Sequence, residues 1–195
     1  LGSETNFFGL NNVEKYSFTM KTLADAISLR NRLIDMLEQA ENEKNPKIKE
    51  RLLTFVIVGG GFAGVETAGE INDFLHDAVS YYHNTKKEDI HVILVEAAST
   101  ILQGFNKRFT QYAHNKLEKN GIKIVLENAV TSFDGKNIIL NKLSKPSVGI
   151  DSKNIINSHT LVWTAGVTPV KIIQNSIFKI KKGKIIVNEF LEIPN

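Results

Sequence analysis

The stretch FVIVGGGFAGVETAGE, residues 55–70, runs from an apolar segment through a glycine-rich turn into a helical pattern. Residues 52–58 are almost entirely apolar, which is typical of a strand that is buried on both faces of a parallel sheet. Gly59, Gly61 and Gly64 then follow with the spacing G-x-G-x-x-G. This order predicts a strand, a tight turn and a helix within a parallel α/β sheet.

A turn of this kind binds the phosphates of a dinucleotide, and each glycine has its own role. The first permits the tight turn, the second lets a pyrophosphate approach the backbone, and the third lets the helix pack closely on the strand. The free N–H groups and the positive end of the helix then stabilise the anion. A glycine-rich turn without a ligand is the alternative. The predicted cofactor contacts in the turn are Gly59, Gly60, Gly61, Phe62, Ala63 and Gly64.

Glu96 ends a second apolar strand, which is expected over residues 91–96. A carboxylate at this place accepts hydrogen bonds from the adenosine ribose hydroxyls and repels a 2′-phosphate. Residues 97–99 hold no cation that could neutralise such a phosphate, so the sequence favours NAD over NADP. Glu96 follows Gly64 by 32 residues (96 − 64), whereas the usual separation is about 20. A longer helix and turn absorb the difference; a glutamate that merely faces solvent is the alternative.

The helix after the turn carries two acidic residues, Glu66 and Glu70, one helical turn apart. A like-charge pair at this spacing costs about 0.2–0.5 kcal/mol, so we expect a compensating interaction nearby. Glu66 either stabilises the positive end of the helix or acts beside the reacting ring as a proton relay. It is therefore the candidate catalytic residue.

A second loop with small side chains follows a later strand. Thr164, Ala165 and Gly166 lie where the segment TLVWTAGV, residues 160–167, gives way to a loop. Small residues allow a flat cofactor to lie against the backbone, so these three are further predicted cofactor contacts. An ordinary strand end is the alternative.

The remaining segments alternate between apolar runs and helical patterns, with turn residues between them. They predict an α/β fold, a Rossmann-like three-layer NAD(P)-binding domain with a parallel sheet and a small antiparallel β-meander. The expected elements are a loop-like edge piece at residues 1–18, an amphipathic helix at 19–40 capped by Thr19 or Thr22, a polar connection at 41–50 with a helical turn opened by Pro46, helices at 63–83 and 107–119, a strand at 122–127, the meander at 129–157 with a turn at Asp134-Gly135, and a hairpin turning at Gly183.

The composition of the chain gives no indication of a nucleic-acid-binding, membrane-spanning or metal-binding protein. The chain has 195 residues, of which 42% are hydrophobic and 23% charged, as is usual for soluble globular proteins. Its formal net charge of +3 is too small to indicate nucleic-acid binding. No apolar run is long enough to span a bilayer, and a cytoplasmic location is expected. The chain lacks cysteine, and His76 and His83 have no evident third partner, so no metal site is predicted.

These segments together resemble the pyridine nucleotide and flavin-linked oxidoreductases, and most closely the type II NADH dehydrogenases, which are single-chain NADH:quinone oxidoreductases. GVE after the glycine turn and WTAG before the loop are typical of the type II branch. The matching stretches, spread over nearly the whole chain, are GSETNFFG, KTLADAISLRNR, FVIVGGGFAGVETAGE, VILVEA, ILQGF and VWTAGV.

The resemblance implies that NADH contacts the glycine turn, Glu96 and the loop of residues 164–166, with Glu66 near the junction of nicotinamide, flavin and quinone. In that family NADH passes a hydride to FAD, and the reduced flavin passes electrons to a quinone at the membrane face. The candidate partners are thus NADH, the FAD-binding domain of a parent chain, a quinone and a second copy of the chain. The parent enzyme is expected to be peripheral on the cytoplasmic face of the membrane.

Complete family members carry a second glycine fingerprint and a Gly-Asp segment for FAD, together with C-terminal amphipathic helices that attach to membranes. This chain has one such fingerprint, no Asp after Asp151, and Leu at position 1. We therefore expect residues 19–195 to be an excised or truncated NADH-binding domain, with a linker helix at 19–50, a Rossmann-like core at 51–195, and a remnant of the FAD-binding domain at 1–18. Such a chain should bind NADH, but neither hold FAD nor turn NADH over.

Two other interpretations of the sequence remain. A sibling flavoprotein, such as a ferredoxin or nitrite reductase component or a sulfide:quinone oxidoreductase, would carry a similar nucleotide-binding domain. A non-catalytic NAD-sensing module would also bind the dinucleotide without an electron acceptor.

Overall fold

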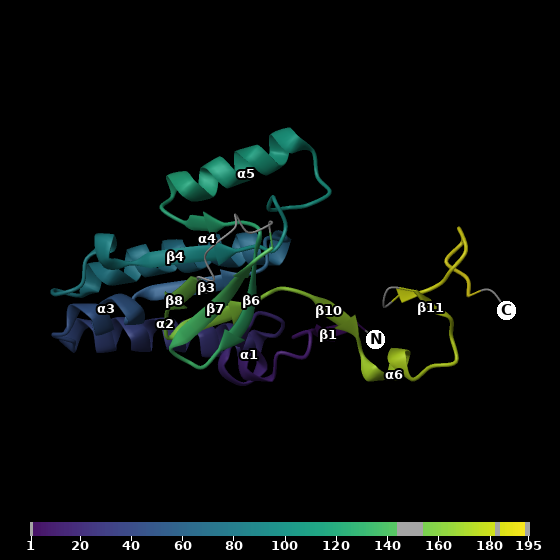
Figure 1. The fold of residues 1–195 in the computed structure, drawn as a ribbon, viewed down its shortest axis with the longest axis horizontal. Helices are drawn as coiled ribbons and strands as arrows, with labels where there is room; N and C mark the ends of the chain where they lie inside the picture. Colours follow the sequence, from purple (N-terminus) through teal and green to yellow (C-terminus); the bar gives the residue numbers. More distant parts are fainter. Residues whose placement is uncertain (1, 144–153, 182–183, 194–195) are drawn as a thin grey trace, which may run out of the picture.

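The centre of the fold is a five-stranded parallel sheet with the strand order β2-β9-β3-β4-β5. A computed structural model describes residues 2–143, 154–181 and 184–193 of the chain (Figure 1). The expected parallel sheet is confirmed, and the strand of residues 54–58 lies at its middle. In chain order its strands are β2 (Phe18–Thr19), β3 (Thr54–Val58), β4 (His91–Val95), β5 (Lys123–Val125) and β9 (Thr160–Trp163).

Four helices cover one face of this sheet, and their buried side chains share one hydrophobic core. The helix after the glycine turn is shorter than expected, since it ends at Ala78 and passes into a 3₁₀ turn. The segment expected as a linker helix at 19–50 is two helices, because Asn45 caps a separate one that begins at Pro46. The helices are α2 (Leu23–Asn42), α3 (Pro46–Leu52), α4 (Phe62–Ala78) and α5 (Lys107–Lys119), with short 3₁₀ helices at Val79–Tyr81 and Lys87–Asp89.

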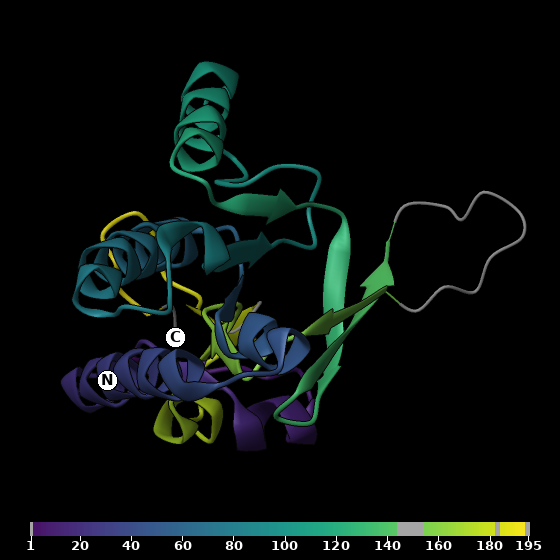
Figure 2. The same ribbon diagram turned by 90° about the vertical axis from the view of Figure 1, so that its left-hand side faces the viewer.

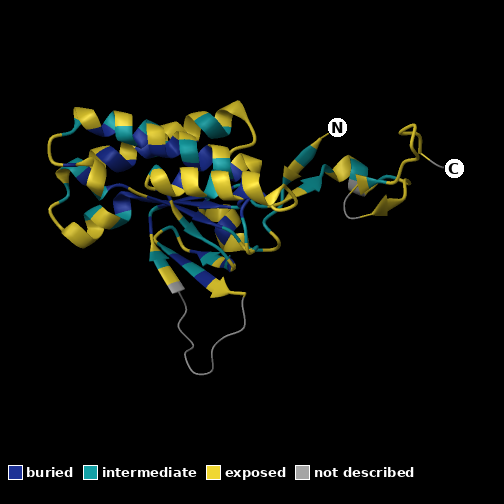
Figure 3. Ribbon diagram, turned by 90° about the horizontal axis from the view of Figure 1, so that it is seen from above, coloured by how far each residue is buried: buried dark blue, intermediate teal, exposed yellow. Residues whose placement is uncertain are grey.

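Side chains of β3 alternate between two separate hydrophobic cores, as a buried strand requires. Phe55 and Ile57 pack with the helices, whereas Val56 and Val58 pack on the other face. That second face is covered by an antiparallel meander, which lies opposite α2 and α4 (Figure 2). Burial is therefore concentrated in the parallel strands between two covering layers (Figure 3).

The meander confirms the expected small antiparallel sheet. Its order is β6-β7-β8, and Asp134 holds the turn between the first two strands by accepting hydrogen bonds from the N–H groups of Lys136 and Asn137. Part of the connection to its last strand lies outside the described residues. The strands are β6 (Asn128–Phe133), β7 (Asn137–Lys142) and β8 (Asn154–Asn157).

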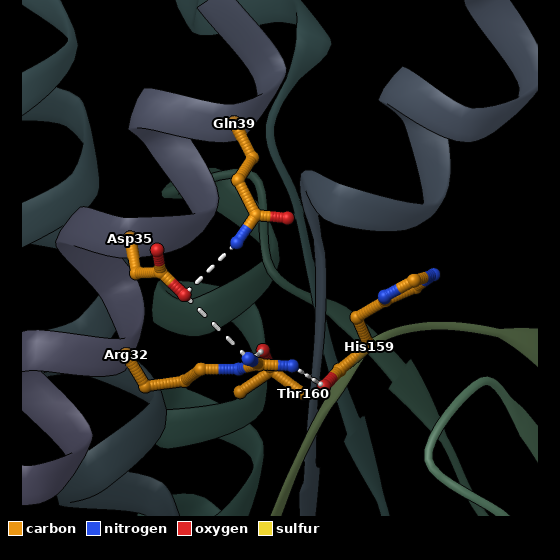
Figure 4. A network of polar contacts seen from close by, with 5 residues as sticks. All are labelled: Arg32, Asp35, Gln39, His159 and Thr160. Atoms are coloured by element: carbon orange, nitrogen blue, oxygen red, sulfur yellow. Dashed lines mark hydrogen bonds and ion pairs between the residues drawn. The ribbon is translucent and has the colours of Figure 1, made fainter. Parts of the chain in front are cut away.

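Polar contacts fix α2 to the beginning of β9 (Figure 4). Arg32 donates to the backbone carbonyl of His159 at 2.6 Å and to Thr160 Oγ1 at 3.4 Å. Asp35 forms an ion pair with Arg32 at 3.7 Å and accepts from Gln39 at 3.0 Å. The helix starts with a capping box between Thr22 and Asp25, as the sequence predicts.

The expectation that residues 1–18 form a loop-like edge piece is wrong, because they contain a strand and a helix. Asn11–Tyr16 form the helix α1, whose Val13 is completely buried in the core beneath the meander. A strand, β1 (Ser3–Thr5), precedes it and pairs with β10 (Val167–Pro169) in antiparallel fashion. The boundary at residue 18 between two domains stays a prediction, although this segment packs on the sheet of the following domain.

The last part of the chain extends away from the sheet together with β1 and β10 (Figures 1 and 3). Its only described β pairing is a short hairpin, and Gly183, the expected turn residue, lies outside the described residues. Its elements are α6 (Lys171–Gln174), β11 (Ile180–Lys181) and β12 (Lys184–Ile185).

Candidate functional site

Three neighbouring strands end in register and bring the predicted contacts to one edge of the sheet. Val58 at the end of β3 pairs with Val95 of β4 and with Trp163 of β9. The next residue of each strand, Gly59, Glu96 or Thr164, therefore lies at the same carboxyl edge. The crevice outside such an edge is where open α/β sheets bind their ligands.

The first and third glycines bring strand and helix into close contact. Gly59 has φ +111°, a conformation that side chains rarely adopt, and a Cβ there would lie 2.9 Å from the backbone nitrogen of Ala165. A Cβ on Gly64 would lie 1.7 Å from the carbonyl oxygen of Gly59. Neither position can hold a side chain without movement of the backbone, so both glycines are required by the packing itself.

Gly61 differs because the protein around it is open. A Cβ at this position would meet no atom within 4 Å, and the residue is exposed at the N-cap of α4. The packing of the described residues therefore does not require a glycine here. The first-turn N–H groups of a helix have no partner within the helix, so the open side of Gly61 suits an anion such as a pyrophosphate.

Glu96 is tied directly to the glycine turn. Its carboxylate accepts hydrogen bonds from the N–H groups of Gly60 and Ala98, the latter at 2.6 Å, one on each oxygen. The side chain is half-buried. Each carboxylate oxygen has a further lone pair, so the group can also accept hydrogen bonds from ribose hydroxyls.

Leu102 holds the turn on the same side. Its N–H donates to the carbonyl oxygen of Gly60 at 2.6 Å, and its own backbone lies in the left-handed region at φ +50°. Its side chain is buried, which stabilises this strained conformation. This contact is not predictable from the sequence, because a backbone donor in a loop leaves no pattern of residue types.

Thr164 holds the turn from the opposite side. Its hydroxyl donates to the carbonyl oxygen of Val58 at 2.8 Å and lies 3.4 Å from that of Gly59. The backbone then turns at Gly166, which has φ +77°. The loop of residues 164–166 thus borders the glycine turn on the side away from Glu96.

Several predicted site residues on α4 are exposed. Ala63 and Glu66 are exposed on α4, and Phe62 is half exposed with its ring edge-to-face against Phe105 at 4.9 Å. Among the described residues no hydrogen bond or ion pair is formed by the side chain of Glu66 or Glu70. The compensating partner expected for this pair is thus absent from the described part of the chain, and solvent screens the two charges instead.

Other parts of the described chain do not form a second site of this kind. A cavity of about 640 Å³ lies at the opposite edge of the sheet, where Thr54, His91 and Lys123 begin their strands, and so it is separate from the glycine turn. Within the described ranges no cluster of three or more His, Cys, Asp or Glu could hold a metal ion. No described helix has the length and apolar character to cross a bilayer.

Comparisons with known proteins show what the chain is similar to. A family model described as pyridine nucleotide-disulphide oxidoreductase matches residues 1–195. The external alternative NADH-ubiquinone oxidoreductase of Yarrowia lipolytica is 32% identical, over 99% of this chain and 34% of that protein. The type II NADH:quinone oxidoreductase Ndh of Mycobacterium tuberculosis is 33% identical, over 88% of this chain and 36% of that protein.

A solved structure shares the fold. NDH2 from Plasmodium falciparum in complex with NADH superposes with a TM-score of 0.80 at 23% identity, over 89% of this chain and 35% of that one. The chain thus spans about a third of the length of the relatives that it matches.

Proposed function

Because the chain belongs to the pyridine nucleotide-disulphide oxidoreductase family, we propose that it binds NADH at the carboxyl edge of β3, β4 and β9. The family predicted from the sequence is confirmed by the match over the whole chain. The observation that carries the proposal is the position of Glu96, whose carboxylate accepts from the N–H of Gly60. A carboxylate held in this position would accept hydrogen bonds from a ribose, beside a turn that would bind the pyrophosphate.

The glycine turn would hold the pyrophosphate. Gly61 leaves the approach open, and the N–H groups of Phe62 and Ala63 begin a 17-residue helix. Backbone donors at such a helix end are fixed before the ligand arrives, so little ordering is required on binding. Gly59 and Gly64 would act indirectly, since they let α4 and β3 pack closely enough to form the turn.

Glu96 would select the form of the nucleotide. Its carboxylate would accept hydrogen bonds from the ribose hydroxyls and would lie against the 2′-phosphate of NADP(H). Residues 97–99 carry no positive charge that could offset this repulsion. We therefore expect a preference for NADH over NADPH.

The loop formed by Thr164, Ala165 and Gly166 would border the nicotinamide half. It lies on the opposite side of the glycine turn from Glu96, and its side chains are small. Glu66 is exposed on the second turn of α4, so its carboxylate could reach the ring or simply face solvent. Its role as a proton relay stays a prediction.

We further propose that the chain is the NADH-binding part of a flavin-dependent NADH:quinone oxidoreductase. Relatives named as NADH-ubiquinone or NADH:quinone oxidoreductases support this assignment. NADH supplies a hydride when bound, and FAD held by another part of the parent enzyme would accept it. The parent enzyme would meet its quinone as a peripheral protein at the membrane. The chain itself would bind NADH without turnover.

Calorimetric titration of the chain with NADH and NADPH tests the nucleotide site. We expect NADH to bind and NADPH to bind about tenfold more weakly, a difference of about 1.4 kcal/mol, because the 2′-phosphate would lie against the carboxylate of Glu96. Equal affinities would refute the role of Glu96, and failure to bind NADH would refute the site.

A longer chain that includes the flavin-binding part tests the parent activity. Bound FAD together with NADH-dependent quinone reduction is expected of the dehydrogenase. A flavin that reduces ferredoxin or oxidises sulfide instead would identify a sibling flavoprotein. A chain that binds NADH but never binds flavin would identify an NAD-sensing module.

A further inference from the structure

The first residues of the chain cover the loop that would border the nicotinamide. Strand β1 pairs with β10, directly after this loop, with Thr5 opposite Val167. The N–H of Asn6 then donates to the carbonyl oxygen of Gly166 at 3.3 Å. Residues 3–8 therefore form a strap along the loop of residues 164–166, on backbone hydrogen bonds that do not depend on side-chain identity.

The single tryptophan of the chain fixes the strap to β9. Trp163 is 4% exposed, and its Nε1–H donates to the carbonyl oxygen of Asn6 at 3.0 Å. Its ring stacks on Phe7, with ring centres 5.8 Å apart and planes 28° apart. Because Trp163 immediately precedes Thr164, this contact sets the direction in which the chain leaves the sheet and enters the loop.

Phe8 closes the strap over Gly166. A Cβ on Gly166 would lie 2.5 Å from Cζ of the Phe8 ring. Phe8 itself has φ +52°, which is unusual for a bulky residue, and its N–H is held by Asn6 Oδ1 at 2.8 Å. The ring is nevertheless 64% exposed, so it contributes little to a core. An exposed aromatic residue in a strained conformation, seated on a glycine of a ligand-binding loop, is better explained by the position of that loop than by stability.

We propose that residues 3–8 are a positioning segment of the NADH site, which fixes the loop of residues 164–166 for the nicotinamide half of the ligand. This inference rests on the proposed function. The strap acts through Trp163 and Gly166 and does not itself contact the reacting ring. A loop that is already ordered loses less conformational freedom when the ligand binds, so the strap should raise affinity.

The strap should affect one half of the ligand only. Glu96 and Leu102 hold the glycine turn from the side of β4, whereas Thr164 holds it from the side of β9. Within the described residues, the strap contacts Trp163 and Gly166 on the β9 side. Loss of the strap should therefore weaken contacts to the nicotinamide and leave the adenosine and pyrophosphate contacts unchanged.

The test compares NADH with ADP-ribose, which lacks the nicotinamide, by calorimetry on the whole chain. Trp163→Phe keeps the aromatic ring but removes the hydrogen bond to Asn6, and Phe8→Ala removes the ring over Gly166. We expect each variant to bind NADH about three- to tenfold more weakly, as for the loss of one hydrogen bond or ordered contact. ADP-ribose affinity should remain within about twofold of that of the unchanged chain.

Two further variants sharpen the result. Phe190→Ala removes another exposed phenylalanine, which is 75% exposed and lies after β12 in the chain, and should alter neither affinity. Gly166→Ala should weaken NADH binding, and part of that loss should be recovered in the double variant with Phe8→Ala, because the ring that the new methyl group meets is then gone.

The outcomes separate the two proposals. Equal weakening of NADH and ADP-ribose, or no weakening of either by Phe8→Ala, overturns the positioning role; since Phe8 is largely exposed, this variant should fold even if Trp163→Phe does not. If the unchanged chain binds neither NADH nor ADP-ribose, the proposed function itself is refuted, and the positioning role with it.

Discussion

Alanine substitutions at Gly61, Gly64 and Gly69 place the same methyl group in three different surroundings around α4. At Gly61 the methyl group meets no protein atom within 4 Å, and the backbone at φ −75° suits alanine. The free energy of unfolding should fall by less than about 1 kcal/mol, from the weaker N-cap alone. The same methyl group would, however, occupy the approach of the pyrophosphate.

The expected loss of NADH affinity in Gly61→Ala follows from the hydrogen bonds that the turn would donate to the pyrophosphate. Two charge-assisted bonds from backbone N–H groups to phosphate contribute about 1.5 kcal/mol or more each. Their loss, about 3 kcal/mol, corresponds to roughly a 100-fold weaker binding of NADH. The fold and stability should remain close to those of the unchanged chain.

Gly64→Ala should reduce both the stability of the fold and the affinity for NADH. Its Cβ would lie 1.7 Å from the carbonyl oxygen of Gly59, whereas non-bonded heavy atoms are stable at about 3.5 Å. The helix and the turn must therefore separate by nearly 2 Å, which should cost about 1–3 kcal/mol of stability, as in other overpacked cores. The displaced turn should also lose its affinity for NADH.

Gly69→Ala is the matched control within the same helix. Nothing lies within 4 Å of the added methyl group, and alanine favours a helix interior over glycine by about 0.8–1 kcal/mol. This variant should therefore be more stable and bind NADH normally. Urea unfolding and calorimetric titration measure both quantities. If Gly61→Ala binds NADH as the unchanged chain does, the pyrophosphate does not lie on this turn, and the reasoning is refuted.

Three further predictions concern single side chains. Glu96→Gln replaces one carboxylate oxygen, which accepts from a backbone N–H, by an amide donor. NADH should therefore bind about tenfold more weakly, while NADPH binding changes less. If calorimetry gives an unchanged ratio of NADH to NADPH affinity, Glu96 does not contact the ribose. Burial, with the nearby charges of Arg32, Lys136 and Arg51, lowers the pKa of His159 from its ordinary value of 6.5. Between the folded pKa and about pH 6.5 the unfolded chain therefore binds more protons than the folded chain. The free energy of unfolding does not change with this group above about pH 6.5, and it falls as the pH drops towards the folded pKa. His159→Gln should reduce this dependence of the free energy of unfolding on pH, measured by urea unfolding at several pH values. Thr22→Ala removes the capping box of α2 and should cost about 1 kcal/mol in urea unfolding without changing NADH affinity.

The central sheet could be predicted because its signals are local and strong. The alternation of Phe55 and Ile57 with Val56 and Val58 matches two buried faces, and the glycine spacing fixes where the strand ends. The meander can be predicted equally well, since Asp134-Gly135 separates two apolar runs. These features depend on neighbours in the chain, so sequence patterns are sufficient to find them.

The helix at Asn11–Tyr16 is not predicted by the sequence, because six residues form less than two turns and show no helical period. Its formation depends on the burial of Val13 beneath the meander, a contact with residues more than 100 positions away. Short helices are stable mainly through such tertiary contacts and not through their own propensity. The end of α4 at Ala78 likewise cannot be recognised from the sequence, since the 3₁₀ turn after it keeps a helical pattern.

The candidate site can be predicted only where it depends on the type of residue at a position. Gly59 and Gly64 have a recognisable spacing, Glu96 follows a recognisable apolar strand, and the structure brings these residues to one edge of the sheet. The contacts from the N–H of Leu102 and to the carbonyl of Asn6 involve backbone atoms, which every residue type possesses. No residue pattern could reveal them, although they determine how the glycine turn and its neighbouring loop are held.

Strand register explains why the unusual spacing between Gly64 and Glu96 does not disturb the site. The extra residues lengthen α4 and the turn before β4, at the far end of the sheet. The carboxyl edge is set instead by strand register, which pairs Val58 with Val95. Because the strands are in register, the position of Glu96 beside Gly60 is independent of the length of the intervening helix. Separation along the chain is thus a weaker criterion for this kind of site than the register of the two strands that carry it.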